Sequence, residues 1–397
     1  MSDLATQLIH HPYRPPEGFE AVAPGVHKAS TVIFSNVQAL RTQEWKDKSG
    51  YTYGLHGTPT TFTLEERIAT LEGGRFCVLA PSGLSAVSLV DMAFLQQGDE
   101  LLIPDNAYGP NKAFASAELA RWGITHHFYD PLDPADLAAQ ITPATRLVWL
   151  ESPGSITLEF PDLPALTAVV GAANVGRTRR ILTALDNTWG AGIAFNGFDV
   201  GADVVMQALT KYPSGGADVL MGSVVTRDEA LHQQVLMVHM RLGLGVGAND
   251  AELVLRGLQT IALRYAAQDA TTRELATWMK AQPGVVRVLH PALTGSPGHA
   301  AWQRDARAAG CLFSAVFDER FSQGQIDAFC DSLRRFKLGW SWAGPISLCA
   351  PYNVVSIRTR PWPHRGALVR FAVGLEAVDD LQQDLQQALQ QLNNTGA

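Results

Sequence analysis

The sequence predicts an α/β protein in which helices cover both faces of a mostly parallel sheet, joined to a smaller C-terminal α+β domain. The chain has 397 residues, of which 46% are hydrophobic and 17% charged, which is enough for two globular domains with full cores. Short apolar runs alternate with helical patterns over residues 63–226, as in sheets whose strands are joined by helical crossovers. A glycine-rich stretch at residues 242–247 interrupts this pattern, and the elements after it indicate the second domain.

The first 56 residues lack regular periodicity and are rich in Pro, Gly, Tyr and Thr. They predict an extended arm with loops. Because the arm has no pattern that would build a core of its own, we expect it to lie on another subunit. Leu64, Ile68 and Leu71 then recur at helical spacing and begin the large domain. The expected parts are an arm over residues 1–56, a large domain over residues 57–247 and a C-terminal domain over residues 248–397.

In the large domain, short apolar runs predict strands, and Gly and Pro residues separate them from helical segments. The expected strands lie at residues 76–80, 100–103, 125–129, 146–151, 180–186, 204–208 and 222–226. The expected helices begin at residue 63 and after residue 83, and lie at residues 111–122, 134–140 and 163–175. Ligands of such sheets bind outside the carboxyl ends of the strands, where Ser82, Glu151, Asp186 and Lys211 fall.

In the C-terminal domain, one long helix is expected over residues 250–281. The other expected elements are strands near residues 285–289, 312–317 and 369–373 and helices at residues 324–335 and 378–392. The last helix has a single apolar stripe, which predicts that it packs on the domain core. The stripe consists of Leu381, Leu385, Leu389 and Leu392.

Composition argues against several classes of partner. The net charge is −7 and there is no basic tract, so neither nucleic acid nor an anionic membrane surface is expected. No apolar run is long enough to span a bilayer, and the polar, proline-bearing residues 1–24 are not a secretory signal. The four cysteines and eleven histidines show no metal-ligand spacing. We therefore expect buried thiols in a reducing cytoplasm, no disulfides and no metal.

Lys211 and Asp186 carry the strongest chemical signal. Asp186 ends one predicted strand, and Lys211 follows a later one in the run Thr210-Lys211-Tyr212. Pyridoxal phosphate (PLP) needs two such groups from a protein: a lysine amine to form a Schiff base, and a carboxylate to keep the pyridine nitrogen protonated. Taken alone, the pair could equally be a buried ion pair. The flanking residues favour the PLP site.

Further segments suit a PLP site. The turn Pro81-Ser82-Gly83-Leu84 lies between a strand and a helix, where free N–H groups and the helix dipole can hold a phosphate. Thr210 can add a hydroxyl to this cradle. Tyr108 follows a strand and offers an aromatic face to the pyridine ring. Arg370 lies in the late strand and can hold a substrate carboxylate in bidentate fashion. A surface charge on an edge strand is the alternative for Arg370, although a buried arginine between apolar neighbours would need a partner.

Several motifs in order make the chain resemble the Cys/Met-metabolism family of PLP enzymes, and within it the bacterial cystathionine β-lyases. The resemblance runs from about residue 5 to residue 393. It implies a PLP fold type I, aspartate-aminotransferase-like subunit, with residues 57–247 as the PLP-binding domain, in a homotetramer of two tight dimers. The motifs are Leu71-Glu72-Gly73-Gly74, Leu150-Glu151-Ser152-Pro153-Gly154-Ser155, Asp186-Asn187-Thr188-Trp189, Thr210-Lys211-Tyr212, His290-Pro291-Ala292-Leu293 with Pro297-Gly298-His299, and Ser341-Trp342.

The resemblance assigns a role to each matching position. It implies that Lys211 is the Schiff-base lysine and proton shuttle, that Asp186 is the partner of the pyridine nitrogen, and that Tyr108 stacks on the ring. It implies that Tyr53 reaches across the dimer interface to the neighbour's phosphate. The phosphate cradle is implied to be Gly83, Leu84 and Thr210, and the carboxylate site Ser341, Trp342 and Arg370. Core packing is an equally good interpretation of Trp342 taken alone, and Glu151 is expected only to end its strand.

The chain departs from the family pattern at three places. The family's arm arginine, which binds the neighbour's phosphate, is Leu55 here, and His56 is a weaker substitute because histidine is largely neutral at neutral pH. The family's Gly-His-Ser-Asp after the lysine is Gly215-Gly216-Ala217-Asp218. The motif that begins at Ser341 lacks its glutamate, which is Ile346 here. These changes bear on cofactor affinity and substrate preference.

The expected reaction is α,β-elimination of L-cystathionine to homocysteine, pyruvate and ammonia. The alternative within the family is a γ-class enzyme: a methionine γ-lyase, a cystathionine γ-synthase or a cystathionine γ-lyase. Trp342 and the 151–155 segment resemble the β-lyases, because γ-enzymes more often have leucine after the serine and Asn-Pro after Ser-Pro-Thr. A further alternative is a protein of this fold that serves as a binding or regulatory partner, against which the intact Lys211, Asp186 and Arg370 argue.

Overall fold

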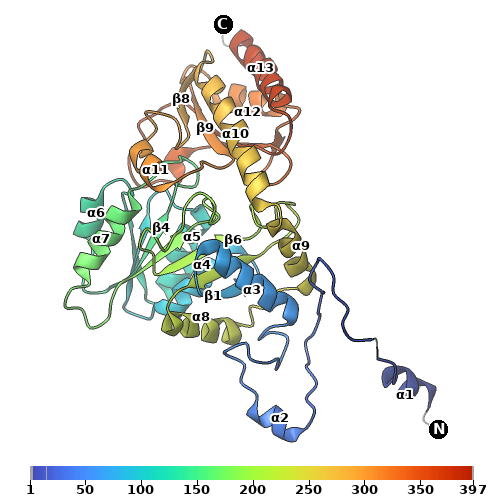
Figure 1. Cartoon of the computed structure of the whole chain (residues 1–397). Helices are drawn as coiled ribbons and strands as arrows, with labels where there is room; N and C mark the ends of the chain where they lie inside the picture. The colour runs from blue at the N-terminus through green and yellow to red at the C-terminus, as the bar shows by residue number, and fades with distance from the viewer. Residues whose placement is uncertain (1–2, 15, 396–397) are drawn as a thin grey trace.

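The computed structural model describes residues 3–14 and 16–395, in which two sheets are each packed against helices (Figure 1). The larger sheet has seven strands in the order β1-β7-β6-β5-β4-β2-β3. Only β7 runs antiparallel to its neighbours, so the prediction of a mostly parallel sheet is confirmed. The strands are β1 Phe76–Ala80, β2 Glu100–Pro104, β3 Thr125–Tyr129, β4 Thr145–Glu151, β5 Leu182–Asp186, β6 Val204–Ala208 and β7 Gly222–Thr226.

Both faces of this sheet are buried under helices. Along β4, Leu147 and Trp149 belong to one apolar cluster and Val148 and Leu150 to the other, because successive side chains of a strand point to opposite faces. Helices α3, α6, α7 and α9 contribute to the cluster of Val148, and α4, α5 and α8 lie on the other face. Their bounds are α3 Pro59–Glu72, α4 Gly83–Phe94, α5 Gly109–Phe114 with a π-helical turn Ala115–Leu119, α6 Pro134–Gln140, α7 Leu163–Ala173, α8 Glu229–Leu242 and α9 Ala248–Leu258.

The C-terminal domain has a five-stranded sheet in the order β10-β11-β12-β9-β8. Helices α10, α12 and α13 pack on one face of it, and the predicted leucine stripe of the last helix is buried there. The strands are β8 Val285–Leu289, β9 Leu312–Phe317, β10 Lys337–Leu338, β11 Leu348–Tyr352 and β12 Leu368–Ala372. The helices are α10 Ile261–Lys280, α11 His299–Asp305, α12 Gln323–Ser332 and α13 Val378–Thr395, with a short 3-10 turn Val354–Ser356.

The prediction of one long helix over residues 250–281 is wrong, because the chain leaves the helical conformation at Thr260 (φ −118°, ψ 7°) between α9 and α10. Gly257 lies against backbone of the large domain, where an added Cβ would come within 2.2 Å of the Pro213 carbonyl oxygen. This close approach fixes the path of α9. Helix α8 was not predicted, although Asp228 caps its start and Gly243 its end. Strand β11 was not predicted either.

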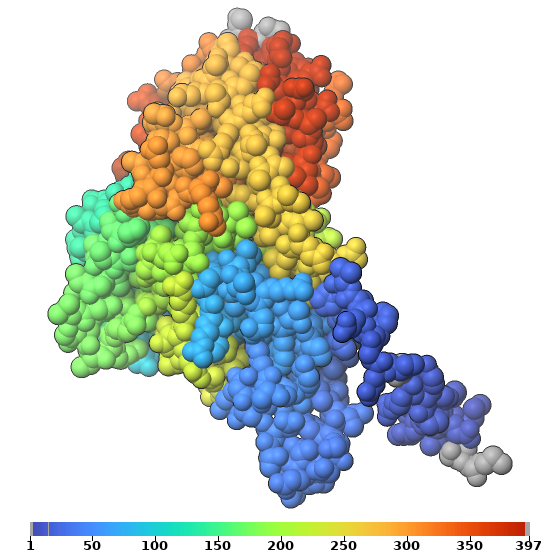
Figure 2. Space-filling view, viewed as in Figure 1, coloured from blue at the N-terminus to red at the C-terminus, as the bar shows by residue number. Residues whose placement is uncertain are grey.

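The arm contains two short helices, α1 Leu4–Ile9 and α2 Val37–Thr42, which correct the prediction of an arm without regular elements. Neither helix buries a residue. Large apolar side chains along the arm are exposed, among them Phe19 at 89% and Val22 at 99%. Figure 2 shows the arm leaving the body of the molecule, so these side chains lack a partner within the described part of the chain.

All four cysteines are buried and free of disulfides, as expected. Among the described residues, no helix combines the length and apolar character that crossing a membrane requires.

Asp91 gives the fold a pH dependence. It lies in α4, fully buried, where its Oδ1 accepts a hydrogen bond of 2.8 Å from the Trp149 indole and its Oδ2 finds no partner. Burial raises the pKa of Asp91 to about 8. This raised pKa contributes stability that is complete below about pH 4, the pKa in the unfolded chain, and is lost as the pH rises through 8.

We predict that Asp91→Asn weakens the fall in stability with rising pH. The parent should lose up to about 1.4 kcal/mol per pH unit from this one group within that window, whereas the amide cannot ionise and still accepts the indole N–H. Thermal midpoints of both proteins, measured from pH 5 to pH 9 at one concentration, test this. A difference between the two midpoints that stays constant with pH would contradict it.

Candidate active site

The carboxyl ends of β2, β4, β5 and β6 meet at one edge of the large sheet, because these strands run parallel. Glu151 ends β4 and is the register partner of Asp186, which ends β5. Lys211 follows β6 in a tight turn, in which its N–H donates to the Ala208 carbonyl at 3.1 Å. Parallel pairing therefore brings together chemical groups that are far apart in the sequence.

The Lys211 amine lies at the junction of the two domains. Its Nζ is 2.8 Å from Ser341 Oγ and 5.3 Å from the centre of the Trp342 ring. Burial and the positive charge of Arg370 lower the pKa of Lys211 to about 8, and the Asp186 carboxylate opposes part of this shift. A lysine with such a pKa is partly neutral near pH 7, as a nucleophile or base must be.

Asp186 interacts electrostatically with this amine but forms no ion pair with it. Its Oδ1 accepts the Thr188 N–H at 2.9 Å, and no ion pair among the described residues includes it. Burial raises the pKa of Asp186, although Thr188 and Lys211 lower it in part. Thr188 Oγ1 also accepts the Ala208 N–H at 2.9 Å, which joins the end of β5 to β6. The carboxylate is thus held by Thr188 and has no ion-pair partner among the described residues.

Arg370 is a buried cation without an acid. It projects from β12 with 5% of its surface exposed. It donates to the Ser155 carbonyl at 3.2 Å and the Trp340 carbonyl at 3.1 Å and lies 5.2 Å from the Tyr352 ring centre. Within the described ranges it takes part in no ion pair. The alternative of a surface charge is therefore wrong, because the side chain is buried. A buried guanidinium with only neutral acceptors can take a carboxylate.

The turn after β1 has the form of an anion cradle. Ser82 caps α4 by accepting the Ser85 N–H at 3.0 Å, which leaves the first N–H groups of the helix, at Gly83 and Leu84, without helical acceptors. An added Cβ at Gly83 would lie 2.6 Å from the Ala208 side chain, so only glycine allows this approach. The Thr210 hydroxyl bonds the Met221 backbone N–H at 3.2 Å and carbonyl at 3.3 Å.

Tyr108 stands at the start of α5 and is 39% exposed. Its N–H donates to Glu151 Oε2 at 2.7 Å. Burial and the neighbouring Asp186 carboxylate raise the pKa of Glu151 well above its usual value. Glu151 therefore orients the tyrosine, which the sequence analysis missed. The position of Glu151 at the end of a wholly apolar run was the sequence feature that could have indicated this role.

Glu72 is a second acidic residue to which the sequence analysis assigned no role. It is fully buried and accepts hydrogen bonds from the side chains of Asn187 at 2.8 Å and Gln207 at 2.6 Å. Burial raises the pKa of Glu72 to about 8. It connects the end of α3 to Asn187, which follows Asp186, and to Gln207 of β6, the strand before Lys211.

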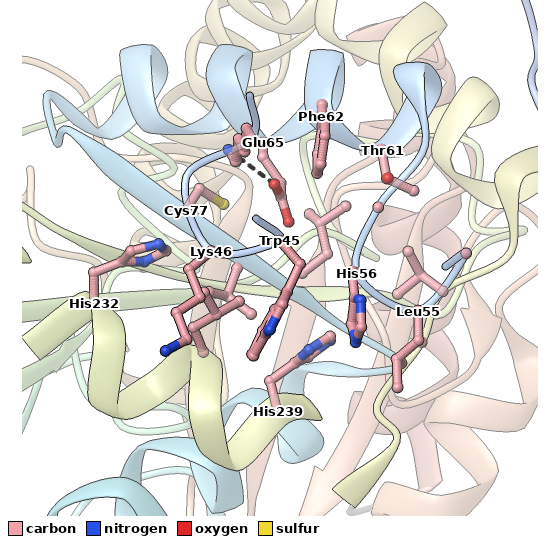
Figure 3. A pocket seen from close by; sticks show the side chains of 18 residues that line it. Trp45, Lys46, Leu55, His56, Thr61, Phe62, Glu65, Cys77, His232 and His239 are labelled. Atoms are coloured by element: carbon pink, nitrogen blue, oxygen red, sulfur yellow. Dashed lines mark ion pairs between the residues drawn. The ribbon is translucent and has the colours of Figure 1, made fainter. Parts of the chain in front are cut away.

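Tyr53 and His56 lie away from this cluster in the same chain. Tyr53 is 47% exposed and pairs with Thr31 through an isolated β-bridge. His56 stacks on Trp45 with ring centres 4.6 Å apart and lies 2.7 Å from Thr52 Oγ1. Figure 3 shows it inside a pocket beside Trp45 and above α8. Burial lowers the pKa of His56, so it offers a hydrogen bond rather than a charge at neutral pH.

Leu55 and the other two departures also have defined surroundings. Leu55 packs at Gly245, where an added Cβ would lie 3.3 Å from its Cδ1. Ala217 adopts a left-handed conformation with φ 59°. Ile346 is 56% exposed, and the neighbouring Ser347 bonds Glu376 through both its N–H and its hydroxyl. Glu376 therefore provides a carboxylate next to the position where the motif lacks one.

Comparison with known proteins identifies the family of the chain. The family model "Cys/Met metabolism PLP-dependent enzyme" matches residues 5–390. The chain belongs to this family. Its members depend on PLP, and the protein has the PLP fold type I architecture of a large α/β domain with a smaller second domain.

Individual relatives cover nearly the whole chain. The cystathionine beta-lyase MetC of Escherichia coli (strain K12) is 36% identical over 387 residues, which are 96% of this chain and 97% of that protein. The structure of metB from Corynebacterium glutamicum superposes with a TM-score of 0.86 at 26% identity and covers 98% of both chains. A cystathionine gamma synthase from Xanthomonas oryzae pv. oryzae has a TM-score of 0.85 at 32% identity and covers 94% of both.

The residues of this family member suit PLP in three respects. The cradle at Gly83 and Leu84 has free N–H groups for a phosphate. Asp186 is a carboxylate without an ion-pair partner in the described part of the chain, as a partner of a protonated ring nitrogen should be. Lys211, the expected Schiff-base lysine, has an amine whose pKa is lowered.

We predict that Arg370→Met raises the pKa of Lys211, because it removes the positive charge that disfavours the ammonium form. The acylation rate of Lys211 in cofactor-free protein, followed against pH by peptide mass spectrometry, measures this pKa. Arg304→Met, which alters an arginine paired with Asp162, is the control and should leave the profile unchanged. An unchanged profile in Arg370→Met would show that the two charges do not interact.

Proposed function

We propose that the protein is a cystathionine β-lyase that catalyses α,β-elimination of L-cystathionine to homocysteine, pyruvate and ammonia. The observation that carries the proposal is the position of the Lys211 amine, 2.8 Å from Ser341 and 5.3 Å from the Trp342 ring, with Arg370 close enough to lower its pKa. A base, a carboxylate anchor and an aromatic wall thus surround one small volume.

Arg370 and Ser341 hold the substrate's α-carboxylate in this proposal. Among the described residues Arg370 makes two hydrogen bonds, both to carbonyls, so its guanidinium has donors left for a bidentate carboxylate. The anchored carboxylate places the α-carbon near Lys211, since Ser341 already contacts the lysine. Trp342 excludes water from the same side.

Lys211 acts as the proton carrier. Its neutral form removes the proton from the α-carbon, and its protonated form returns a proton to the sulfur of the leaving thiol. PLP, when bound, supplies the electron sink for the α-carbanion. The negative charge of Asp186 would keep the ring nitrogen of the cofactor protonated, and Tyr108, oriented by Glu151, would cover the ring. Gly83, Leu84 and Thr210 hold the phosphate.

A γ-class reaction is the second candidate. The structural similarity to a cystathionine gamma synthase at 32% identity favours it. Such a reaction also removes a proton from the β-carbon, so it needs the base to reach two carbons. Trp342 beside Lys211 narrows the space for that movement, which supports the β-lyase.

We further propose a cytoplasmic homotetramer built from two tight dimers, in which Tyr53 completes the neighbour's site. The exposed apolar side chains of the arm support this, because a second subunit would cover them. Within each chain, we propose the division into an arm (1–56), a PLP-binding domain (57–247) and a C-terminal domain (248–397).

We predict that L-cystathionine yields pyruvate faster than α-ketobutyrate. The assay measures both keto acids and free thiol from one reaction. Lys211→Ala should abolish turnover while it preserves the fold, because no other amine in the described part of the chain bonds Ser341. A dominant α-ketobutyrate signal would place the protein in the γ class, and substantial activity in Lys211→Ala would exclude this lysine as the base.

We predict that Leu55→Arg strengthens cofactor retention. A new charge-assisted contact to the neighbour's phosphate is worth roughly 1.5–3 kcal/mol, so PLP loss on dialysis should slow by about ten-fold or more. His56→Ala should hasten the loss if the imidazole donates to the phosphate. If neither substitution changes the dialysis rate, other groups hold the phosphate.

A further inference from the structure

We propose that Asp105 is a positioning residue that holds the loop between β11 and β12 against the large domain and thereby fixes Arg370 for substrate binding. We call residues 353–367, which connect Tyr352 to Leu368, the strap. The proposal rests on the function of Arg370 proposed above. It concerns a residue that does not contact the substrate itself.

Asp105 directly follows β2, three residues before Tyr108, and is 1% exposed. Its carboxylate accepts hydrogen bonds from three donor groups of the strap. The Thr359 N–H and hydroxyl both lie 2.9 Å from Oδ1, and the Arg360 N–H lies 3.0 Å from Oδ2. Burial alone would raise the pKa of Asp105, but these bonds and the charge of Lys112 outweigh it and lower the pKa.

Basic side chains surround this carboxylate on both domains. Lys112 on α5 lies 3.1 Å from Asp105 Oδ1 and also donates to the Ile357 carbonyl of the strap at 2.8 Å. Arg358 Nε lies 3.7 Å from Asp105 Oδ2. Arg360 pairs with Asp136 of α6 at 2.6 Å. Asp105 is therefore the central acid between cations of the large domain and of the strap.

The strap leads directly to the substrate arginine. It joins β11 and β12, which pair in the register that places Ala350 opposite Arg370. Near its start, Val354 packs with Leu368 in a small apolar cluster. Near its end, an added Cβ at Gly366 would lie 1.6 Å from the Phe317 carbonyl oxygen, so the strap packs closely on the end of β9 before it enters β12. The packing of Val354 on Leu368 therefore connects the strap to β12, two residues before Arg370.

Away from Asp105, the strap also contacts the large domain through Arg358, which pairs with Glu159 at 2.5 Å, and through Arg360, which pairs with Asp136, whereas other positions of the strap are open. Val355 is 71% exposed and the side chain of Arg365 is 87% exposed. The Arg358 side chain, in contrast, is only 10% exposed. Protection of the peptide bond after Arg358 therefore reports whether the strap is held.

The test compares Asp105→Asn and Thr359→Val with the parent, all loaded with PLP. Asp105→Asn removes the charge at constant size, and Thr359→Val removes one hydrogen bond from the strap side without altering the large domain. Asp199→Asn, on the exposed side chain paired with Arg227, is the matched control. Trypsin cleavage after Arg358 is measured by mass spectrometry, and the affinity for L-alanine, which has no leaving group, by the absorbance of the bound cofactor.

We expect Asp105→Asn to accelerate cleavage after Arg358 at least five-fold and to weaken L-alanine binding at least five-fold. Thr359→Val should have a smaller effect of the same kind, and the double variant should be no worse than Asp105→Asn, since both act on one contact. Unchanged cleavage, or faster cleavage with unchanged L-alanine affinity, would overturn the proposal. Neither readout needs turnover, so absence of lyase activity would refute the proposed reaction alone.

Discussion

The placement of uncompensated charges at one buried sheet edge is the constraint on which the site depends. Parallel strands end together, and here their ends bring Asp186, an acid without an ion-pair partner among the residues that the structure describes, near an amine of lowered pKa, Lys211. Arg370 enters the same space from the second domain with only carbonyl acceptors. Leaving such groups unpaired in a folded protein is costly. A ligand with a cationic ring nitrogen, an electrophilic carbon and a carboxylate on the bound substrate would satisfy all three.

The large domain was the part of the fold most readily predicted. Most of its strands are short apolar runs, because both faces of the central part of a parallel sheet are buried, and turn residues mark the ends; the edge strand β3, Thr125–Tyr129, is more polar. The break at Thr260 could not be predicted in this way. It depends on Gly257 meeting backbone from the loop after Lys211, a contact between segments that are distant in sequence. Strand β11 was missed because it contains Pro351 and has only two fully buried positions, Cys349 and Ala350.

The site was predictable where one residue carries the chemistry, and less so where residues act through others. Lys211 and Asp186 could be predicted from their residue types and from their positions at strand ends. Glu151 and Asp105 also stand at strand ends, but their contacts with Tyr108 and with the strap involve backbone N–H groups, which every residue has. No pattern of side chains encodes such partners. Only the three-dimensional structure identifies them.

Identification of the residue to which the cofactor attaches tests the role of Lys211 most directly. The PLP-loaded protein is treated with borohydride, which fixes the cofactor covalently to its lysine, and the digested protein is examined by mass spectrometry. The account predicts a single pyridoxyl group, on Lys211. A label on Lys112, the lysine beside the end of β2, or no label at all, would contradict it.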